Sequence, residues 1–177
     1  MRNGFFRPIV VLAAICIAVT GAIALVNDVT HPIIEAAAAE GAREAMQVII
    51  PGADVFEPLD TDGFKDVPEA FMAMDDAGGL LGYIFVATSN GFGGEMRVML
   101  GIDPGGKIMG VRTLQHSETR GFGDYIDHDH PSGFAGSLTG KGSGLEGVDG
   151  VTGATVTFKA FVAAVDEAFG AFEAVGN

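Results

Sequence analysis

Hydrophobic residues are concentrated near the start of the chain. Residues 8–26 hold no charged side chain and are almost all apolar. As a helix, this run reaches roughly 28 Å at about 1.5 Å per residue, which matches the thickness of a bilayer core. Two arginines precede the run, and acids follow it. The positive-inside rule therefore predicts a cytoplasmic N-terminus at 1–7, a transmembrane helix at 8–27 and an extracytoplasmic domain at 28–177.

A cleaved signal peptide is the alternative for this segment. The triplet Ala22-Ile23-Ala24 resembles a small-x-small cleavage site. The apolar run is longer than most signal-peptide cores, and we therefore favour an uncleaved anchor. The residue before Cys16 is a bulky isoleucine, where lipoprotein signals carry a small residue, so a lipid-modified cysteine is not expected. Anchor and signal peptide both export the remainder of the chain.

Helical spacing of apolar residues recurs twice beyond this segment. An alanine-rich stretch opens at Pro32, since proline suits a first helical turn, and ends at Pro51-Gly52. From about 156 to 175, apolar residues return every three or four positions. The predicted face of the first helix contains Ile33, Ile34, Ala37, Ala38, Ala42, Ala45, Met46 and Ile49. That of the second contains Phe158, Phe161, Val162, Val165, Phe169 and Phe172.

Three strands are predicted between these helices: one rich in β-branched and aromatic residues, one that alternates imperfectly and one that alternates. The stretches 82–88, 95–102 and 107–114 are separated by turn signals rich in Asn, Asp, Pro and Gly. Residues 53–70 predict loops with short extended pieces. The predicted fold class is α+β: an N-terminal transmembrane helix followed by one domain with an antiparallel sheet and flanking helices. In the third strand, we expect one side to carry Ile108, Gly110, Arg112 and Leu114.

Acidic residues dominate the part of the chain that we expect to be exported. The formal net charge of the chain is −13. Because residues 1–27 carry two arginines and no acid, the remainder carries −15. This charge argues against binding to nucleic acid or to anionic lipid heads. With a single cysteine, the chain forms no intrachain disulfide and no thiolate-ligated cluster of its own.

Three threonines stand at the start of the C-terminal helix. The sequence from Asp149 to Thr157 reads Asp-Gly-Val-Thr-Gly-Ala-Thr-Val-Thr. Any of these threonines suits a helix N-cap. A helix N-terminus that follows a permissive Gly153 also favours a phosphate. Residue chemistry alone leaves both interpretations open, and it does not decide whether a phosphate is held covalently.

Residues 116–150 show little periodicity and are dense in Gly, His, Asp and Ser. A loop of this length is more often functional than ordinary. His128 and His130 alternate, but such clusters are more often solvated loops, and we expect no metal site. Nearby aromatic residues either join the core or line a pocket for a flat ring. In the second case, glycines at 91, 93 and 94 would let the backbone come close to that ring. The aromatic residues are Phe92, Phe122, Tyr125 and Phe134.

The order of these motifs resembles that of a known family. The matching pieces are the N-terminal apolar segment, Val48-Ile49-Ile50-Pro51-Gly52-Ala53, Gly91-Phe92-Gly93-Gly94, Met99-Leu100-Gly101-Ile102-Asp103, His116-Ser117-Glu118-Thr119, Gly121-Phe122-Gly123 and Asp149-Gly150-Val151-Thr152-Gly153-Ala154-Thr155. In this combination the chain resembles the RnfG (RsxG) family, a component of the Rnf ion-translocating electron-transport complex. More broadly, it resembles the flavin-binding domain shared with NqrC, a component of the sodium-pumping NADH:quinone reductase. That family usually has proline at the position of Arg120 and often leucine at that of Phe122.

The resemblance implies a covalent flavoprotein. In that family a separate flavin transferase joins FMN through its phosphate to the last threonine of the Asp-x-x-Ser/Thr-Gly-Ala-Thr motif, which is Thr155 here. The implied function is an electron-carrier subunit on the route linking ferredoxin and NAD, which relays electrons between redox centres of neighbouring Rnf subunits. We expect no catalytic residue and no part in ion passage. The implied FMN-binding residues are Thr155, Thr152, Gly153, Ala154, Thr157, His116, Glu118, Thr119, Gly121, Phe122, Gly123, Gly93 and Gly94.

Two alternatives remain. The NqrC component of a sodium-pumping NADH:quinone reductase generally has a longer chain, and the shorter spacing here favours the Rnf component. A cofactor-free, membrane-tethered binding module would leave the threonines as a simple helix cap. The flavin hypothesis predicts that Thr155→Ala abolishes covalent flavin, whereas Thr157→Ala does not.

Overall fold

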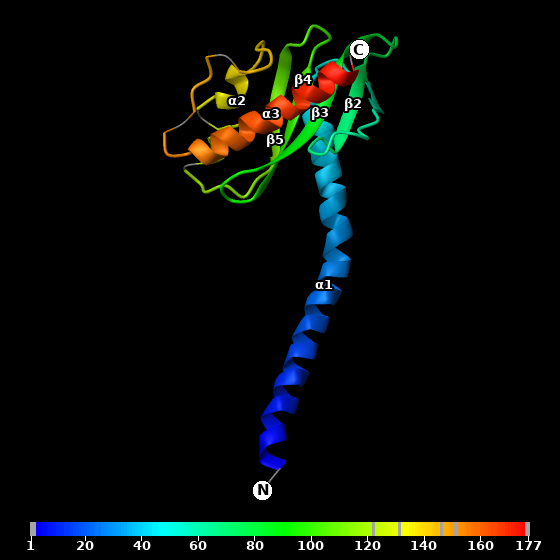
Figure 1. Ribbon diagram of the computed structural model, residues 1–177. Coiled ribbons are helices and arrows are strands. Elements are labelled where there is room, and N and C mark those ends of the chain that lie inside the picture. Colours follow the sequence, from blue (N-terminus) through cyan, green and yellow to red (C-terminus); the bar gives the residue numbers. More distant parts are fainter. Residues whose placement is uncertain (1–2, 122, 131, 146, 151, 176–177) are drawn as a thin grey trace. The chain divides into compact units, whose positions relative to one another are not determined.

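A long N-terminal helix and a five-stranded sheet dominate the chain (Figure 1). The structure is a computed structural model that describes residues 3–121, 123–130, 132–145, 147–150 and 152–175. Its internal contacts divide the chain into two units, Met1–Gly41 and Ala42–Asn177. The predicted α+β class is confirmed: a long apolar helix precedes an antiparallel sheet with helices.

Helix α1 runs without a break over Asn3–Ile49. Its part Arg7–Ile49 contains an 18-residue window with a mean hydropathy of 2.9, and none of that window is buried. By length and composition this helix can cross a membrane, and an N-terminal signal sequence meets the same criterion. The prediction that Pro32 opens a separate helix is wrong, because Pro32 lies inside α1. Proline lacks the backbone N–H that would donate to the preceding turn. The helix continues through it because the alanine-rich residues around it favour helix formation.

The last turns of α1 belong to the second unit and cover one face of the sheet. Of the apolar face predicted for this helix, only its end is buried, while Ile33 and Ile34 are exposed. Ala45, Met46 and Ile49 pack there. The cluster that they join also contains Ile50, Ala53, Ala73, Ile84, Val86 and Met99. Pro51-Gly52 then ends the helix as predicted, since the helix stops at Ile49.

The sheet is an antiparallel meander with the strands in sequence order. Its strands are β1 (Val55–Pro58), β2 (Glu69–Met74), β3 (Leu80–Asn90), β4 (Glu95–Ile102) and β5 (Ile108–Gln115). The three predicted strands correspond to β3, β4 and β5. Strand β1 and the start of β2 lie in the stretch 53–70, for which only loops with short extended pieces were expected, and the rest of β2 was not predicted. Strand β2 reads Glu-Ala-Phe-Met-Ala-Met, and such helix-favouring residues form a strand here because β2 pairs along β3.

One predicted side-chain alternation is wrong in β5. Ile102 pairs with Ile108 and Gly101 pairs with Gly110, which leaves Met109 as an extra residue. This bulge reverses the side on which the following residues point. Ile108 therefore belongs to the core cluster on one face, whereas Leu114 packs against the cluster on the other. The expected common side for Ile108, Gly110, Arg112 and Leu114 does not exist.

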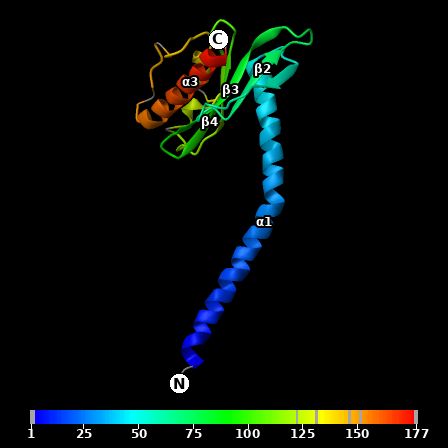
Figure 2. The same ribbon diagram turned by 45° about the vertical axis from the view of Figure 1, so that its right-hand side comes forward.

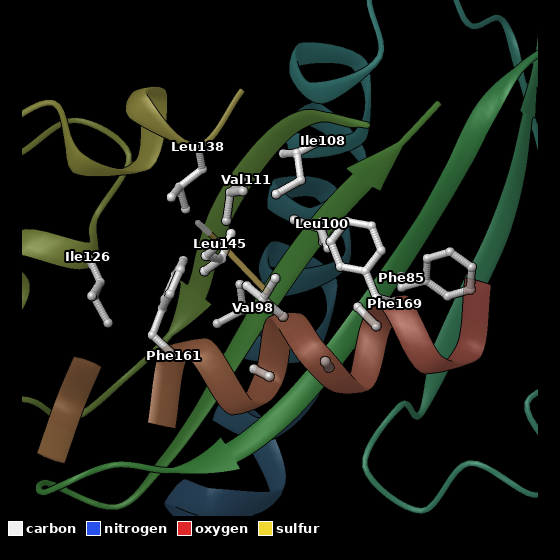
Figure 3. Packing of buried hydrophobic residues seen from close by; sticks show 14 of the residues in the cluster. Phe85, Val98, Leu100, Ile108, Val111, Ile126, Leu138, Leu145, Phe161 and Phe169 are labelled. Carbon is white, nitrogen blue, oxygen red and sulfur yellow. The ribbon is translucent and has the colours of Figure 1, made fainter. Parts of the chain in front are cut away.

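Helix α3 (Thr155–Val175) crosses the other face of the sheet (Figure 1; Figure 2). Its predicted aromatic and aliphatic face is confirmed, since all six residues join or pack against one core cluster. Figure 3 shows Phe161 and Phe169 extending from α3 among Val98, Leu100 and Phe85 of the sheet. Four alanines, Ala160, Ala164, Ala168 and Ala171, are buried between these larger side chains, and their small size lets the helix lie close to the strands.

Among the described residues between β5 and α3, two short helical pieces occur, η1 (Asp124–Ile126) and α2 (Phe134–Ser137). The other described residues of this stretch form turns and irregular backbone, as its lack of periodicity predicts. The stretch leads into the first turn of α3, where the candidate site lies.

Candidate functional site

A cavity of about 390 Å³ opens at the N-terminus of α3. The first amides of a helix have no intrahelical acceptor and carry partial positive charge. Gly153, just before α3, has a φ of +93°, a conformation that glycine adopts without strain. The cavity is lined by Phe92, Glu118, Thr119, Gly123, Gly153, Ala154, Thr155, Val156 and Thr157. Its lining is therefore mostly small or apolar, with hydroxyls and one carboxylate.

The three threonines of the motif have different surroundings. Thr155 is exposed and lines the cavity. Thr157 is only 3% exposed, and its Oγ1 donates a hydrogen bond to Oε2 of Glu118 over 2.5 Å. Thr152 is exposed and is not among the residues that line the cavity. Of the three, Thr155 thus combines exposure with a place in the cavity wall.

Glu118 is a buried carboxylate in this wall. Its side chain is 8% exposed. Besides the hydroxyl of Thr157, the backbone N–H of Gly93 donates to its Oε1 over 3.1 Å. The surrounding glycines leave room for this side chain. A Cβ at Gly91 would lie 2.1 Å from Oε1, and a Cβ at Gly123 would lie 2.6 Å from the Cβ of Glu118.

These contacts change the interpretation of the glycines at 91 and 93. We expected them to let the backbone approach a flat ring. A Cβ at Gly93 would instead lie 1.9 Å from the carbonyl oxygen of Ser117. The glycines at 91 and 93 therefore let the turn between β3 and β4 pack against Ser117 and Glu118. Gly94 has a φ of +129° and open space around it, so its role is conformational.

A second cavity, of about 530 Å³, is also lined by Glu118. The backbone N–H of Glu118 donates to Nδ1 of His116, which assigns the ring proton to Nε2. That nitrogen lies 3.1 Å from Asp127. The cavity is lined by His116, Glu118, Arg120, Asp124, Asp127, Asp129 and His130. Glu118 thus belongs to the walls of both a mostly apolar and a strongly polar cavity.

Of the four aromatic residues for which the sequence left core packing and a ring slot open, two join the core. Tyr125 and Phe134 are buried, and their ring centroids lie 5.1 Å apart inside the core. They complete the core beneath the loops because an edge-on aromatic pair buries a large apolar area. Phe92 is 75% exposed and lines the first cavity. Phe122 lies outside the described residues.

The histidines at 128 and 130 do not come together as a cation site. His130 lines the second cavity and its Nδ1 lies 2.9 Å from Ser132 Oγ, while His128 is exposed. Within the described ranges, no group of three or more His, Cys, Asp and Glu residues is arranged to hold a metal ion.

The structure brings most of the predicted site residues to one place. Thr155, Gly153, Ala154, Thr157, Glu118, Thr119 and Gly123 line the first cavity. Gly93 donates to Glu118, and His116 lies in the second cavity. Gly121 donates its N–H to Asp124 Oδ1, and Thr152 and Gly94 do not line either of these cavities. The sequence interpretation missed Val156 and Asp127, which carry no motif signal of their own.

Similarity to known proteins decides what kind of domain this is. The profile of a family described as the FMN-binding domain matches residues 91–170. This part of the chain belongs to the FMN-binding domain family. Every residue that lines the first cavity falls within the matched part of this FMN-binding domain.

Relatives of this FMN-binding domain protein are components of a redox complex. It is 34% identical over 129 residues to the G subunit of an ion-translocating oxidoreductase complex from Cereibacter sphaeroides, covering 68% of this chain and 59% of the relative. A protein of the same name from Shewanella baltica is 29% identical over 189 residues, covering 95% of this chain and 87% of the relative. The chain thus spans less than two thirds of the Cereibacter protein.

A solved structure has the same fold. The crystal structure of Shewanella oneidensis NqrC matches with a TM-score of 0.51 and 22% sequence identity, covering 67% of this chain and 66% of the other.

The residues around the first cavity fit an FMN group. Its volume of about 390 Å³ falls within the 300–1,000 Å³ typical of small-molecule sites. Apolar side chains with a few polar groups are the lining that a flat ring requires. The N-terminus of α3 suits a phosphate, and Thr155 stands at that end of the same cavity.

Proposed function

We propose that this chain is an electron carrier with FMN joined through its phosphate to Oγ1 of Thr155. The observation that carries the proposal is the position of Thr155. It is exposed, it begins α3, and it lines a mostly apolar cavity inside the FMN-binding domain. The hydroxyl of Thr157 already donates to Glu118, which argues against Thr157 as the attachment residue.

The N-terminus of α3 stabilises the attached phosphate. A phosphodiester keeps one negative charge, and a helix N-terminus stabilises such a charge by about 0.3–1 kcal/mol, or up to about 2 kcal/mol where it is partly buried. Gly153, with its positive φ, lets the backbone amides at this turn point toward one anion. The first turn of α3 therefore serves as both the attachment point and the phosphate site.

Attachment requires an activated form of FMN and a separate flavin transferase. Condensing a hydroxyl with a phosphate monoester releases water and is uphill, so the donor must be a phosphoanhydride of FMN, such as a flavin dinucleotide. The bond between Thr155 Oγ1 and phosphorus forms, the anhydride P–O bond breaks, and a nucleoside monophosphate leaves. The hydroxyl proton is released with it. The exposure of Thr155 makes it accessible to the transferase.

Bound FMN supplies one- and two-electron redox chemistry. The chain's own residues position the group: Thr155 tethers it, and Phe92 and Val156 offer apolar surface beside it. Their side chains exclude water from the ring and so strengthen the electrostatic influence of the groups in the wall. Glu118 contributes the one carboxylate among the residues that line this cavity.

Within the cell, we propose that this chain is the RnfG component of an ion-translocating ferredoxin:NAD oxidoreductase. It relays electrons between redox centres of neighbouring subunits, and α1 anchors it to the inner membrane with the flavin domain on the extracytoplasmic side. The relatives named as G subunits of such a complex and the apolar α1 support this assignment. Ion passage belongs to partner subunits, because residues 8–26 of α1 carry no ionisable side chain apart from Cys16.

In-gel fluorescence tests the attachment. The full chain is expressed with a flavin transferase, and a denaturing gel is viewed under ultraviolet light. Covalent flavin survives denaturation, so the wild-type band fluoresces and the Thr155→Ala band is dark. Thr157→Ala is the control and fluoresces like the wild type, because the hydroxyl of Thr157 is buried and donates to Glu118. A dark wild-type band, or a fluorescent Thr155→Ala band, would contradict the proposal.

A further inference from the structure

Glu118 lines two cavities of different character. The first is the mostly apolar cavity with Thr155, and the second contains the His116–Asp127 pair and further charged residues. Among the described residues, Glu118 is the one buried acid. A carboxylate in this position borders both the proposed flavin site and a polar cavity of about 530 Å³.

Both carboxylate oxygens of Glu118 have hydrogen-bond donors. Oε1 accepts from the N–H of Gly93, and Oε2 accepts from the hydroxyl of Thr157. Because the residue is only 8% exposed, a further negative charge beside this carboxylate is less screened by water than it would be at the surface.

The charged groups around Glu118 all come from one side. The turn at 91–94 and the first turn of α3 supply no titratable side chain. The segment that follows β5 supplies all the others that line the second cavity: His116, Arg120, Asp124, Asp127, Asp129 and His130. Titratable partners for a proton therefore line the second cavity, whereas the turn at 91–94 and the first turn of α3 offer none.

We propose, on the basis of the FMN site above, that Glu118 takes up a proton through the second cavity when one electron reduces the FMN proposed for the first cavity. The electron comes from an external one-electron donor, and the proton comes from the hydronium ions or buffer of the bulk solvent. An O–H bond forms on the Glu118 carboxylate, so the added negative charge is neutralised within the wall. The physical cause is the repulsion between two negative charges, one of them on a carboxylate that is itself buried.

Counting protons tests this role. The full chain carrying covalent FMN is reduced in weakly buffered solution, and proton uptake per flavin is measured with a pH indicator. Glu118→Gln keeps the size of the side chain, and its amide can still accept from the N–H of Gly93 and donate to Oγ1 of Thr157, but it cannot take up the proton. The variant is expected to bind about one proton fewer per flavin than the wild type. Glu167→Gln is the matched control, because Glu167 is an exposed glutamate of α3 that lines neither cavity, and its proton count stays at the wild-type value.

A measurement on the wild type keeps the test decisive if Glu118→Gln does not fold. Infrared difference spectra between the reduced and oxidised states are recorded with isotope-labelled glutamate. Reduction is expected to produce a label-sensitive band of a protonated carboxyl group. The absence of that band, or equal proton counts in the wild type and a folded Glu118→Gln, would overturn the role of Glu118 alone. A wild type without covalent flavin on the denaturing gel would overturn the FMN site and this inference together.

Discussion

At the scale of single residues, the site depends on the geometry of one helical turn. Thr155 and Thr157 are two positions apart in α3, so their side chains point about 200° apart around the helix axis. One therefore lines the cavity while exposed to solvent, and the other is buried against Glu118. The sequence motif contains three similar hydroxyls, and the exact start of the helix decides which of them faces which way.

The hydroxyl of Thr157 is expected to stabilise the fold without being needed for attachment. Thr157→Val keeps the shape of the side chain but removes the donor to the buried Glu118 carboxylate. Leaving a buried acceptor without this donor costs about 1–3 kcal/mol, which lowers the melting temperature of the detergent-solubilised chain. In-gel fluorescence should remain at the wild-type level. Thr157→Ser, which retains the hydroxyl, is the control, and an unchanged melting temperature in Thr157→Val would show that the hydrogen bond contributes nothing.

The candidate site could be predicted only in part from individual residues. The resemblance carried by the motifs identified Thr155, Gly153 and Glu118 as residues of one site, and the structure brings them to the same cavity wall. The hydrogen bond between Glu118 and Thr157 joins residues 39 positions apart, and no local pattern encodes it. Tyr125 could not be separated from Phe92 in the sequence, because both are aromatic residues in irregular loops and only tertiary packing buries one of them.

At the scale of elements, two glycines of the sheet form the surface on which the end of α1 packs. Gly101 of β4 pairs directly with Gly110 of β5. A Cβ at Gly101 would lie 2.2 Å from Cγ2 of Ile49, and a Cβ at Gly110 would lie 3.4 Å from the Cα of Ile49. The missing side chains let the last turn of α1 lie directly on the strands, which explains how one face of the sheet is covered by so short a helical segment.

A double-mutant cycle tests the contact between Gly101 and Ile49. Gly101→Ala forces the new methyl group into Ile49, and such overpacking costs about 1–3 kcal/mol. Ile49→Ala removes the obstructing methyl groups at its own cost of about 2–5 kcal/mol. Because the two residues are in contact, the double variant should be more stable than the sum of the single effects by about 0.5–3 kcal/mol. Thermal unfolding of the full chain measures all four proteins, and strictly additive effects would show that Gly101 and Ile49 do not meet.

Elements with regular patterns could be predicted and irregular ones could not. Strands β3 and β4 are rich in apolar residues because both faces of the sheet are covered, and the three- and four-residue spacing in α3 reflects burial on one face, so both patterns are visible in the sequence. Strand β1 has four residues and ends at Pro58, which is too short a pattern to recognise. The bulge at Met109 arises from pairing with β4, so the sequence of β5 alone predicts the wrong faces.

At the scale of the whole molecule, hydrophobicity and charge are segregated along the chain. The apolar run at 8–26 carries no charge, while the part after residue 27 carries −15. The core clusters and both cavities described above lie within Ala42–Asn177. This separation suits a carrier in which one segment anchors the chain in a membrane and the other holds the redox group.

Cysteine labelling tests the proposed orientation in the membrane. The natural chain has one cysteine, Cys16, inside the apolar run, so Cys16→Ser provides a background without thiols. In that background, Asp76→Cys places a thiol in the exposed turn between β2 and β3. A membrane-impermeant maleimide should label it in intact spheroplasts, because two arginines before the span hold the N-terminus in the cytoplasm. Asn3→Cys is the control on the opposite side and should react only after the membrane is permeabilised. The reverse labelling pattern would overturn the orientation. A measured mass that corresponds to a mature chain starting near Leu25 would show that the apolar run is a cleaved signal peptide.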